Sequence, residues 1–73
     1  MQVYVVIADM EGRVECLGVF KDKTDAMNLC SRQGEKYADH LYPEDYEYEK
    51  VYYDTNGAYV DTFSWTVSEK DIQ

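Results

Sequence analysis

Residues 2–20 read QVYVVIADM-EG-RVECLGVF, and this stretch decides the fold. Its two outer parts, 2–10 and 13–20, are rich in β-branched residues, which favours two strands. Glu11 and Gly12 supply the turn between them, because Gly12 can take a positive φ without steric cost. Pairing across this turn puts Val3, Val5 and Ile7 on one face with Cys16, Gly18 and Phe20, and puts Tyr4, Val6 and Ala8 on the other with Glu15, Leu17 and Val19. Both faces are largely apolar, so we expect the hairpin to lie centrally, where it could be covered on both sides.

A helix is expected directly after this hairpin. Asp22 is a favourable N-cap, with Asp25 three residues later in the capping-box position. The first apolar stripe consists of Ala26, Met27, Leu29 and Cys30. Gly34 leaves two alternatives: it ends the helix as a left-handed cap, or it lies inside a longer helix that runs to Tyr42. We favour the longer helix, because the apolar spacing continues beyond Gly34, and Pro43 ends it in either case.

A second hairpin is expected from residues 46–54 and 58–67. Asn56-Gly57 between them is the strongest short hairpin signal in the chain, and both residues would take positive φ. With this loop, Tyr53 lies opposite Val60. The expected core face collects Tyr46, Tyr48, Lys50 and Tyr52 with Phe63, Trp65 and Val67. Aromatic pairs across strands stabilise sheets, which favours this face for the core.

The predicted fold class is α+β, with the element order β-β-α-β-β. An antiparallel sheet of two hairpins packs against one helix. Residues 1–67 form a single domain, and residues 68–73 form a polar tail that we expect to be frayed. A chain of 73 residues has a small core, so an active site with strained or unpaired groups would be costly.

The charge of the chain is strongly acidic and unevenly spread. Fifteen acidic residues against seven basic ones give a net charge of −8. Between Asp39 and Asp61, seven acids face Lys50 alone. Such a field repels nucleic acid and anionic lipid and attracts basic protein surfaces. We therefore expect no direct nucleic-acid binding and no membrane association. The alternative is that the acidity only keeps the protein soluble.

The chain has few of the residues that catalysis and metal binding require. His40 is the only histidine, it has no nucleophile at a recognisable spacing, and we expect it on the surface or as a cap. Cys-x-x-Cys and His-x₃-His pairs are absent, and the glycines at 12, 18, 34 and 57 form no phosphate-binding loop. The sequence therefore predicts a protein that is not an enzyme and that has no metal and no cofactor.

The two cysteines and the start of the chain bear on the compartment. Cys16 and Cys30 are expected to be reduced and buried, because free cysteine packs like a small hydrophobe. The first residues lack the positive region of a signal peptide, and no run approaches the roughly 18 apolar residues of a membrane span. We expect a cytoplasmic protein.

The opening of the chain is similar to that of a known set of proteins. Val3-Tyr4-Val5-Val6, then Leu17-Gly18-Val19-Phe20, then a capped helix with Ala26 in its first turn resemble small uncharacterised proteins of phage and bacterial genomes. The resemblance covers residues 3–30. It implies the fold and a phage or bacterial origin, with the cytoplasm of a bacterial host as the compartment, and it implies no activity.

The candidate site is the acidic, tyrosine-rich segment that follows Pro43. In a strand, Glu47 and Glu49 lie on one face roughly 6.5–7 Å apart. The expected partner-binding residues are a row of carboxylates that match Arg and Lys on a partner, with two tyrosines as anchors: Glu44, Asp45, Glu47, Glu49, Tyr53 and Tyr59. The alternative is an ordinary half-buried strand with its acids in solvent.

The sequence therefore leaves two functions open. The first is a protein-binding module, an inhibitor or adaptor encoded by a phage, that binds the basic surface of a nucleic-acid-binding protein. Its size and charge are similar to those of small acidic phage proteins that present carboxylates where phosphates would lie. The second is a structural or self-associating domain, a homodimer formed by pairing of sheet edges. Binding that weakens with salt favours the first, and a dimer indifferent to salt favours the second.

Overall fold

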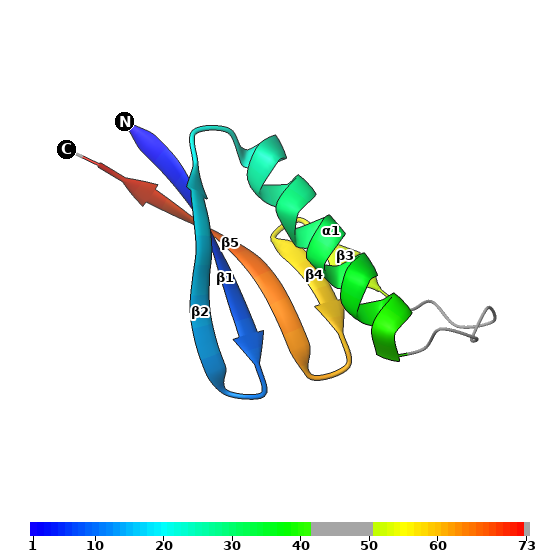
Figure 1. The fold of residues 1–73 in the computed structure, drawn as a ribbon. Coiled ribbons are helices and arrows are strands. Elements are labelled where there is room, and N and C mark those ends of the chain that lie inside the picture. The colour runs from blue at the N-terminus through cyan, green and yellow to red at the C-terminus, as the bar shows by residue number, and fades with distance from the viewer. Residues whose placement is uncertain (42–50, 73) are drawn as a thin grey trace.

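A computed structural model describes residues 1–41 and 51–72 of the chain. Its elements are β1 (Gln2–Met10), β2 (Arg13–Phe20), α1 (Lys23–Leu41), β3 (Tyr52–Asp54), β4 (Gly57–Val60) and β5 (Phe63–Asp71). The strands form one antiparallel sheet in the order β2-β1-β5-β4-β3, and α1 lies across one face of it (Figure 1). The α+β class, with one helix on an antiparallel sheet, is confirmed.

The first hairpin has the predicted strands and the predicted turn. Glu11 and Gly12 have φ of 59° and 92°, and the Asp9 carboxylate accepts a hydrogen bond from the Gly12 N–H at 2.8 Å. Ile7 pairs with Cys16 as expected, but Val6 then pairs with Gly18, so Leu17 is a β-bulge. The bulge exchanges the faces predicted for residues 18–20. As a consequence Phe20 packs against the core beneath α1, and Val19 lies opposite Val5 on the other face.

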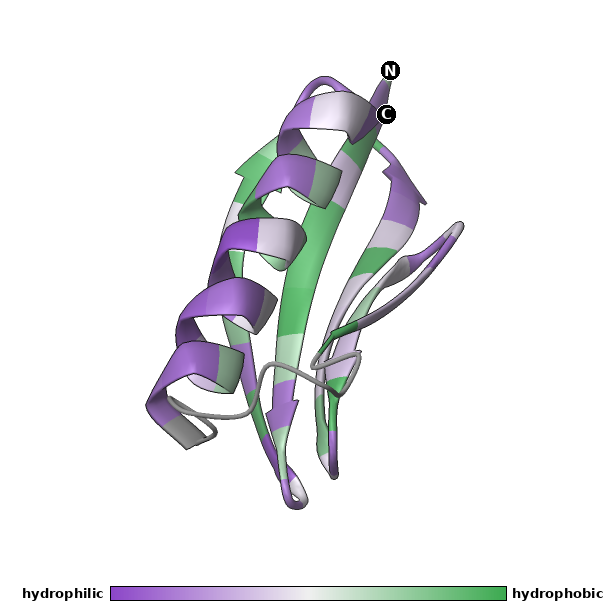
Figure 2. Ribbon diagram, turned by 90° about the vertical axis from the view of Figure 1, so that its right-hand side faces the viewer, coloured by the Kyte–Doolittle hydropathy of each residue, from purple (hydrophilic) through white to green (hydrophobic). Residues whose placement is uncertain are grey.

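The position of this hairpin in the sheet differs from the expectation. β1 lies inside the sheet between β2 and β5, but β2 is an edge strand. Among the described residues, α1 is the only helix and it covers one face, so the hairpin is not covered on both sides (Figure 2). Of the apolar residues on the second face of β1 and β2, Val3 is buried, Val5 and Ile7 are partly exposed, and three on β2 are exposed: Val14, Cys16 and Val19.

The longer of the two predicted helices is the one observed. α1 runs from Lys23 to Leu41 through Gly34, with Asp22 at the N-cap position, and Tyr42 lies outside the described residues. Its buried residues recur every fourth position and are all small: Ala26, Cys30, Gly34 and Ala38. A Cβ on Gly34 would lie 3.1 Å from Val51 Cγ1 and 3.2 Å from Ala58 Cβ. Small residues on this side let the helix approach the sheet closely.

The core lies between α1 and the sheet, with Trp65 at its centre. Trp65 is 1% exposed, and its ring centroid lies 5.2 Å from that of Tyr37 on the helix. The other buried core residues are Val6, Ala8, Ala58 and Val60 of the sheet with Ala26, Cys30 and Ala38 of the helix. The expectation of a buried Cys30 is confirmed. The same expectation for Cys16 is wrong, because Cys16 is exposed on the edge strand β2.

The turn of the second hairpin lies one residue earlier than predicted. Thr55 and Asn56 form it, Asp54 pairs with Gly57, and Tyr53 faces Ala58 rather than Val60. Within the described ranges, the positive φ angles are those of Glu11, Gly12 and Asp61, so the expectation for Asn56-Gly57 is wrong. The Asp54 carboxylate explains the change: it accepts the N–H groups of Asn56 and Gly57 at 2.8 and 2.9 Å.

The run predicted as one strand over 58–67 is divided by a second turn. Asp61 and Thr62 form this turn, with Asp61 at φ 51°, so β4 and β5 pair as a hairpin. Phe63, Trp65 and Val67 pack in or against the core as expected. Tyr52, predicted in the core, is 65% exposed, whereas Val60, which is not on the expected core face, is 1% exposed.

The bounds of β3 and β5 differ from those predicted for the second hairpin. β3 covers only residues 52–54, and residues 46–50 of the predicted strand, with Tyr46, Tyr48 and Lys50, lie outside the described residues. At the other end, β5 continues to Asp71, which pairs with Gln2. Residues 68–71 are therefore part of the sheet and not a frayed tail, because β1 is long enough to pair with them.

Candidate protein-binding site

Of the six residues predicted to bind a partner, the structure describes Tyr53 and Tyr59. Glu44, Asp45, Glu47 and Glu49 lie in the segment 42–50, outside the described residues. Tyr53 pairs with Ala58 and faces the helix side, whereas Tyr59 pairs with Tyr52 and faces the opposite side. Because residues that pair across antiparallel strands share a face, the two predicted anchors Tyr53 and Tyr59 project in opposite directions.

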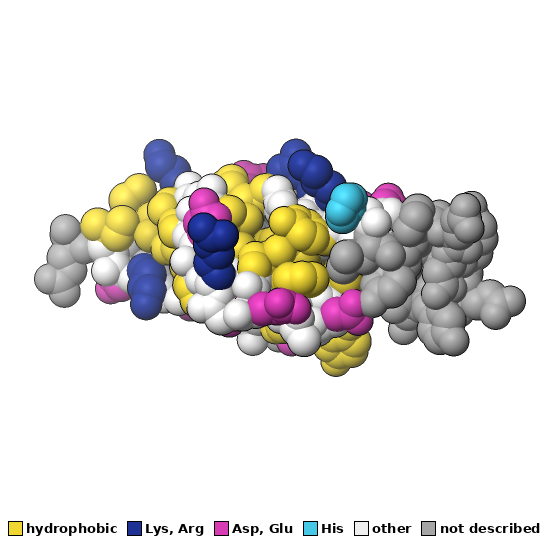
Figure 3. Space-filling model, turned by 60° about the horizontal axis from the view of Figure 1, so that its bottom comes forward, with side chains coloured by type: hydrophobic (Ala, Val, Ile, Leu, Met, Phe, Trp, Pro, Cys, Tyr) yellow, Lys and Arg dark blue, Asp and Glu magenta, His cyan; other side chains and the backbone are white. Residues whose placement is uncertain are grey.

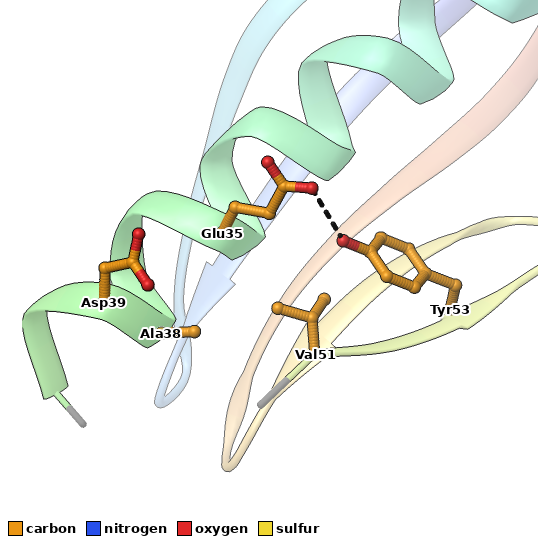
Figure 4. A pocket seen from close by; sticks show the side chains of 5 residues that line it. All are labelled: Glu35, Ala38, Asp39, Val51 and Tyr53. Carbon is orange, nitrogen blue, oxygen red and sulfur yellow. Dashed lines mark hydrogen bonds between the residues drawn. The ribbon is translucent and has the colours of Figure 1, made fainter. Parts of the chain in front are cut away.

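Tyr53 lines a hollow between α1 and the edge strand β3. The hollow has a volume of about 430 Å³ and is lined by Glu35, Ala38, Asp39, Val51 and Tyr53 (Figure 4). The Tyr53 hydroxyl donates a hydrogen bond to Glu35 Oε1 at 3.3 Å. Val51 and Ala38 supply apolar surface between the polar groups. We call these five residues the acidic hollow.

The sequence places the carboxylates of the acidic hollow through helix spacing. Glu35 and Asp39 are four residues apart, so they lie on the same side of α1. Each directly follows a buried small residue, Gly34 or Ala38. The close approach of the helix at Gly34 brings Glu35 within hydrogen-bond distance of Tyr53. Sequence reasoning missed Glu35, and the acidic pair flanking a small-residue stripe is the pattern that could have revealed it.

The electrostatics of the acidic hollow keep Tyr53 protonated. Partial burial raises the pKa of Tyr53 above its ordinary value, and the charge of Glu35 and the hydrogen bond to it raise this pKa further. Tyr53 therefore holds Glu35 as a donor throughout the neutral pH range. Two carboxylates beside an aromatic ring can bind an Arg or Lys side chain, through charge-assisted hydrogen bonds and a contact with the ring face.

Tyr59 forms an aromatic pair with Tyr52 on the other face of the sheet. Its ring centroid lies 6.0 Å from that of Tyr52. Burial raises the pKa of Tyr59, and a hydrogen bond to Asp54 raises it further. The pKa of Asp54 itself is lowered, first by the hydrogen bond from the Asn56 N–H. These contacts fix the hairpin turn, and they place Tyr59 away from the acidic hollow.

The negative charge of the chain is shared between segment 42–50 and the remaining residues. Segment 42–50 has four acids against Lys50, so it carries −3 of the total charge of −8. On the face shown in Figure 3, acidic, basic and hydrophobic side chains are intermixed, and the single histidine, His40, is exposed as expected. Local geometry, rather than a large field on this face, is therefore what distinguishes the acidic hollow.

Over residues 1–41 and 51–72, no three or more His, Cys, Asp or Glu side chains come together in a way that could hold a metal ion. Over the same residues, no helix is both long enough and apolar enough to cross a membrane.

Comparisons with known proteins give no relative. No family model, no curated protein and no solved structure matches this chain.

Proposed function

We propose that this protein is a non-enzymatic binding module that docks onto a basic protein surface through carboxylates and tyrosine. The partner has the Arg- and Lys-rich surface typical of nucleic-acid-binding proteins, and the module acts as an inhibitor or adaptor, in keeping with a phage origin and a bacterial cytoplasm. The acidic hollow is the observation that carries this proposal.

The place of the acidic hollow in the chain supports the proposal. α1 ends at Leu41, two residues after Asp39, and Val51 lines the hollow itself. In the sequence, segment 42–50, which holds Glu44, Asp45, Glu47 and Glu49, connects Leu41 to Val51. Carboxylates from helix and segment would then act on one partner surface. Their repulsion from nucleic acid directs the module to proteins.

Charge reversal tests this proposal. The protein is immobilised, partners are captured from a bacterial host lysate, and the affinity of a captured partner is measured by titration at low and moderate salt. We expect Glu35→Lys with Asp39→Lys to weaken binding about thirtyfold, or 2 kcal/mol, because a buried partner cation loses its counter-charge. Glu47→Lys with Glu49→Lys is expected to act in the same direction.

The matched control is Glu15→Lys with Glu69→Lys, which changes the net charge equally on exposed strand positions. We expect it to weaken binding less than about threefold, through the screened long-range field alone. An equal loss in both pairs would show that net charge, and not the acidic hollow, is responsible. Capture that does not depend on salt would contradict the proposal as a whole.

A further inference from the structure

The sheet has an uncovered face on the side opposite α1. Residues that pair share a face, and Val5 pairs with Val19 and Ser68, so these three point away from the helix. The same alternation along β2, β1 and β5 defines what we call the open face: Val14, Cys16, Val19, Val3, Val5, Ile7, Asp9, Ser64, Thr66, Ser68 and Lys70.

The apolar residues of the open face are contiguous. Val14 and Val19 on the edge strand are 64% and 58% exposed, and Cys16 lies between them. Val5 and Ile7 on β1 lie beside them and are partly exposed, whereas Val3 at the end of β1 is buried. Singly exposed apolar side chains are ordinary on protein surfaces, but a continuous group on two adjacent strands is typical of an interaction surface.

The charged residues of the open face lie at its two ends and have opposite signs. Lys70 is level with Val3 at one end, and Asp9 is at the other, six residues along β1 or about 20 Å away. The other strand charges at these ends, Arg13, Glu69 and Asp71, pair with Met10, Tyr4 and Gln2 and therefore project to the helix side. Between Lys70 and Asp9, the open face carries only apolar, Ser and Thr side chains.

This pattern is complementary to itself in one orientation. We propose that the open face packs against the open face of a second copy, with the strands of the two sheets antiparallel. A two-fold axis perpendicular to the strands brings each Lys70 toward Asp9 of the other copy, and Val5 over Ile7. A two-fold axis along the strands would instead bring Lys70 toward Lys70 and Asp9 toward Asp9, so the charges select the first arrangement.

The size of the open face sets the expected affinity. The three strands of the open face, about 4.8 Å apart and about 20 Å long, give a footprint near 290 Å². A standard stable interface buries about 800 Å² on each partner, so this contact is at the weak end. The dimer is therefore expected to have a dissociation constant of about 10 μM to 1 mM.

Sedimentation equilibrium over a concentration series tests the dimer, and a pair of charge variants tests its orientation. Lys70→Glu should weaken the dimer at least about tenfold, because it places Glu against Asp9 twice. Asp9→Asn keeps an oxygen that can accept the Gly12 N–H, and it should weaken the wild-type dimer. In the Lys70→Glu background the same change should strengthen the dimer, because it removes a repulsion.

Two further variants complete the test. Val19→Asp puts a charge inside the open face and should abolish the dimer while the monomer stays folded, since the position is exposed. Lys36→Glu on the exposed side of α1 makes the same charge change as Lys70→Glu and should leave the dimer unchanged. The proposal is overturned if the protein stays monomeric up to about 2 mM, or if Val19→Asp has no effect on the dimer. It is also overturned if Asp9→Asn changes the dimer affinity in the same direction in the wild-type and Lys70→Glu backgrounds.

This inference is independent of the proposed function. The acidic hollow lies on the helix side, so Glu35→Lys with Asp39→Lys should leave the dimer intact, and Val19→Asp should leave partner binding intact. The test of the dimer and the test of partner binding can therefore give different outcomes.

Discussion

Gly57 and Gly34 both lie where two elements pass closely, but their neighbours differ. A Cβ on Gly57 would overlap the Trp65 carbonyl oxygen and lie 2.9 Å from Thr66 Cα, and both are backbone atoms of β5. Gly57→Ala should therefore destabilise the protein by about 2–4 kcal/mol.

A Cβ on Gly34 would meet side-chain atoms of Val51, Ala58 and Trp65, none closer than 3.1 Å. Alanine is favoured in a helix over glycine by about 1 kcal/mol, which offsets the crowding. Gly34→Ala should change stability by less than about 1 kcal/mol. Urea denaturation of both variants compares them, and losses of equal size would contradict this account.

The two cysteines lie in opposite environments and should react differently. Cys16 is exposed, whereas Cys30 is 0% exposed in the contact between helix and sheet. A thiol reagent should modify Cys16 rapidly in the native protein and Cys30 only at the rate of unfolding. Rapid modification of two thiols per chain would show that the packing of α1 on the sheet does not shield Cys30 from the reagent.

Burial also raises the pKa of the Cys30 thiol above its ordinary value of 9.0, a shift that a backbone hydrogen bond partly offsets. Cys30 therefore ionises at a lower pH in the unfolded chain than in the folded protein. As a consequence, the free energy of unfolding is retained below about pH 9 and falls as the pH rises further. Cys30→Ala should reduce this alkaline loss, as measured by denaturation at a series of pH values.

At the scale of the elements, Trp65 connects β5 to the helix. Trp65→Ala should destabilise the protein by about 3–5 kcal/mol, because it removes the centre of a small core. Tyr52→Ala is the contrasting variant, since Tyr52 is 65% exposed, and it should cost less than about 1.5 kcal/mol. Similar costs for the two would place Trp65 outside the core.

Some elements could be predicted from the sequence and others could not. β1, β2 and α1 have strong local signals: a run of β-branched residues, a turn with Gly12, and small and apolar residues at helical spacing. The second hairpin has competing signals. Asn56-Gly57 favours one turn, while the Asp54 carboxylate favours the turn before it and the contact with Trp65 requires glycine in the strand.

The remaining differences arise from contacts between distant residues. The turn at Asp61-Thr62 contains no Gly or Pro, and Asp61 takes a positive φ because β4 must fold back on β5. The bulge at Leu17 serves the packing of Phe20 against the helix side. Neither contact has a local sequence signal, so neither could be predicted from spacing alone.

At the scale of the whole molecule, two surfaces lie on opposite sides of the sheet. The charge excess near Tyr53 could be recognised from the sequence, but the pairing of Tyr53 with Glu35 joins residues 18 positions apart through the close approach of helix and strand. The open face could not be recognised from the sequence. Its residues alternate along β1 with the core residues Val6 and Ala8, so the two sets together form one continuous apolar run.

The pairing of β1 with β5 joins the first strand to the last, with Gln2 opposite Asp71. During synthesis at about 5–20 residues per second, β1 leaves the ribosome several seconds before its partner is made. In that interval β1 can pair with β2 alone, and a two-stranded hairpin is only marginally stable in water. The sheet therefore closes late, because one edge of β1 has no hydrogen-bonding partner until β5 has been made.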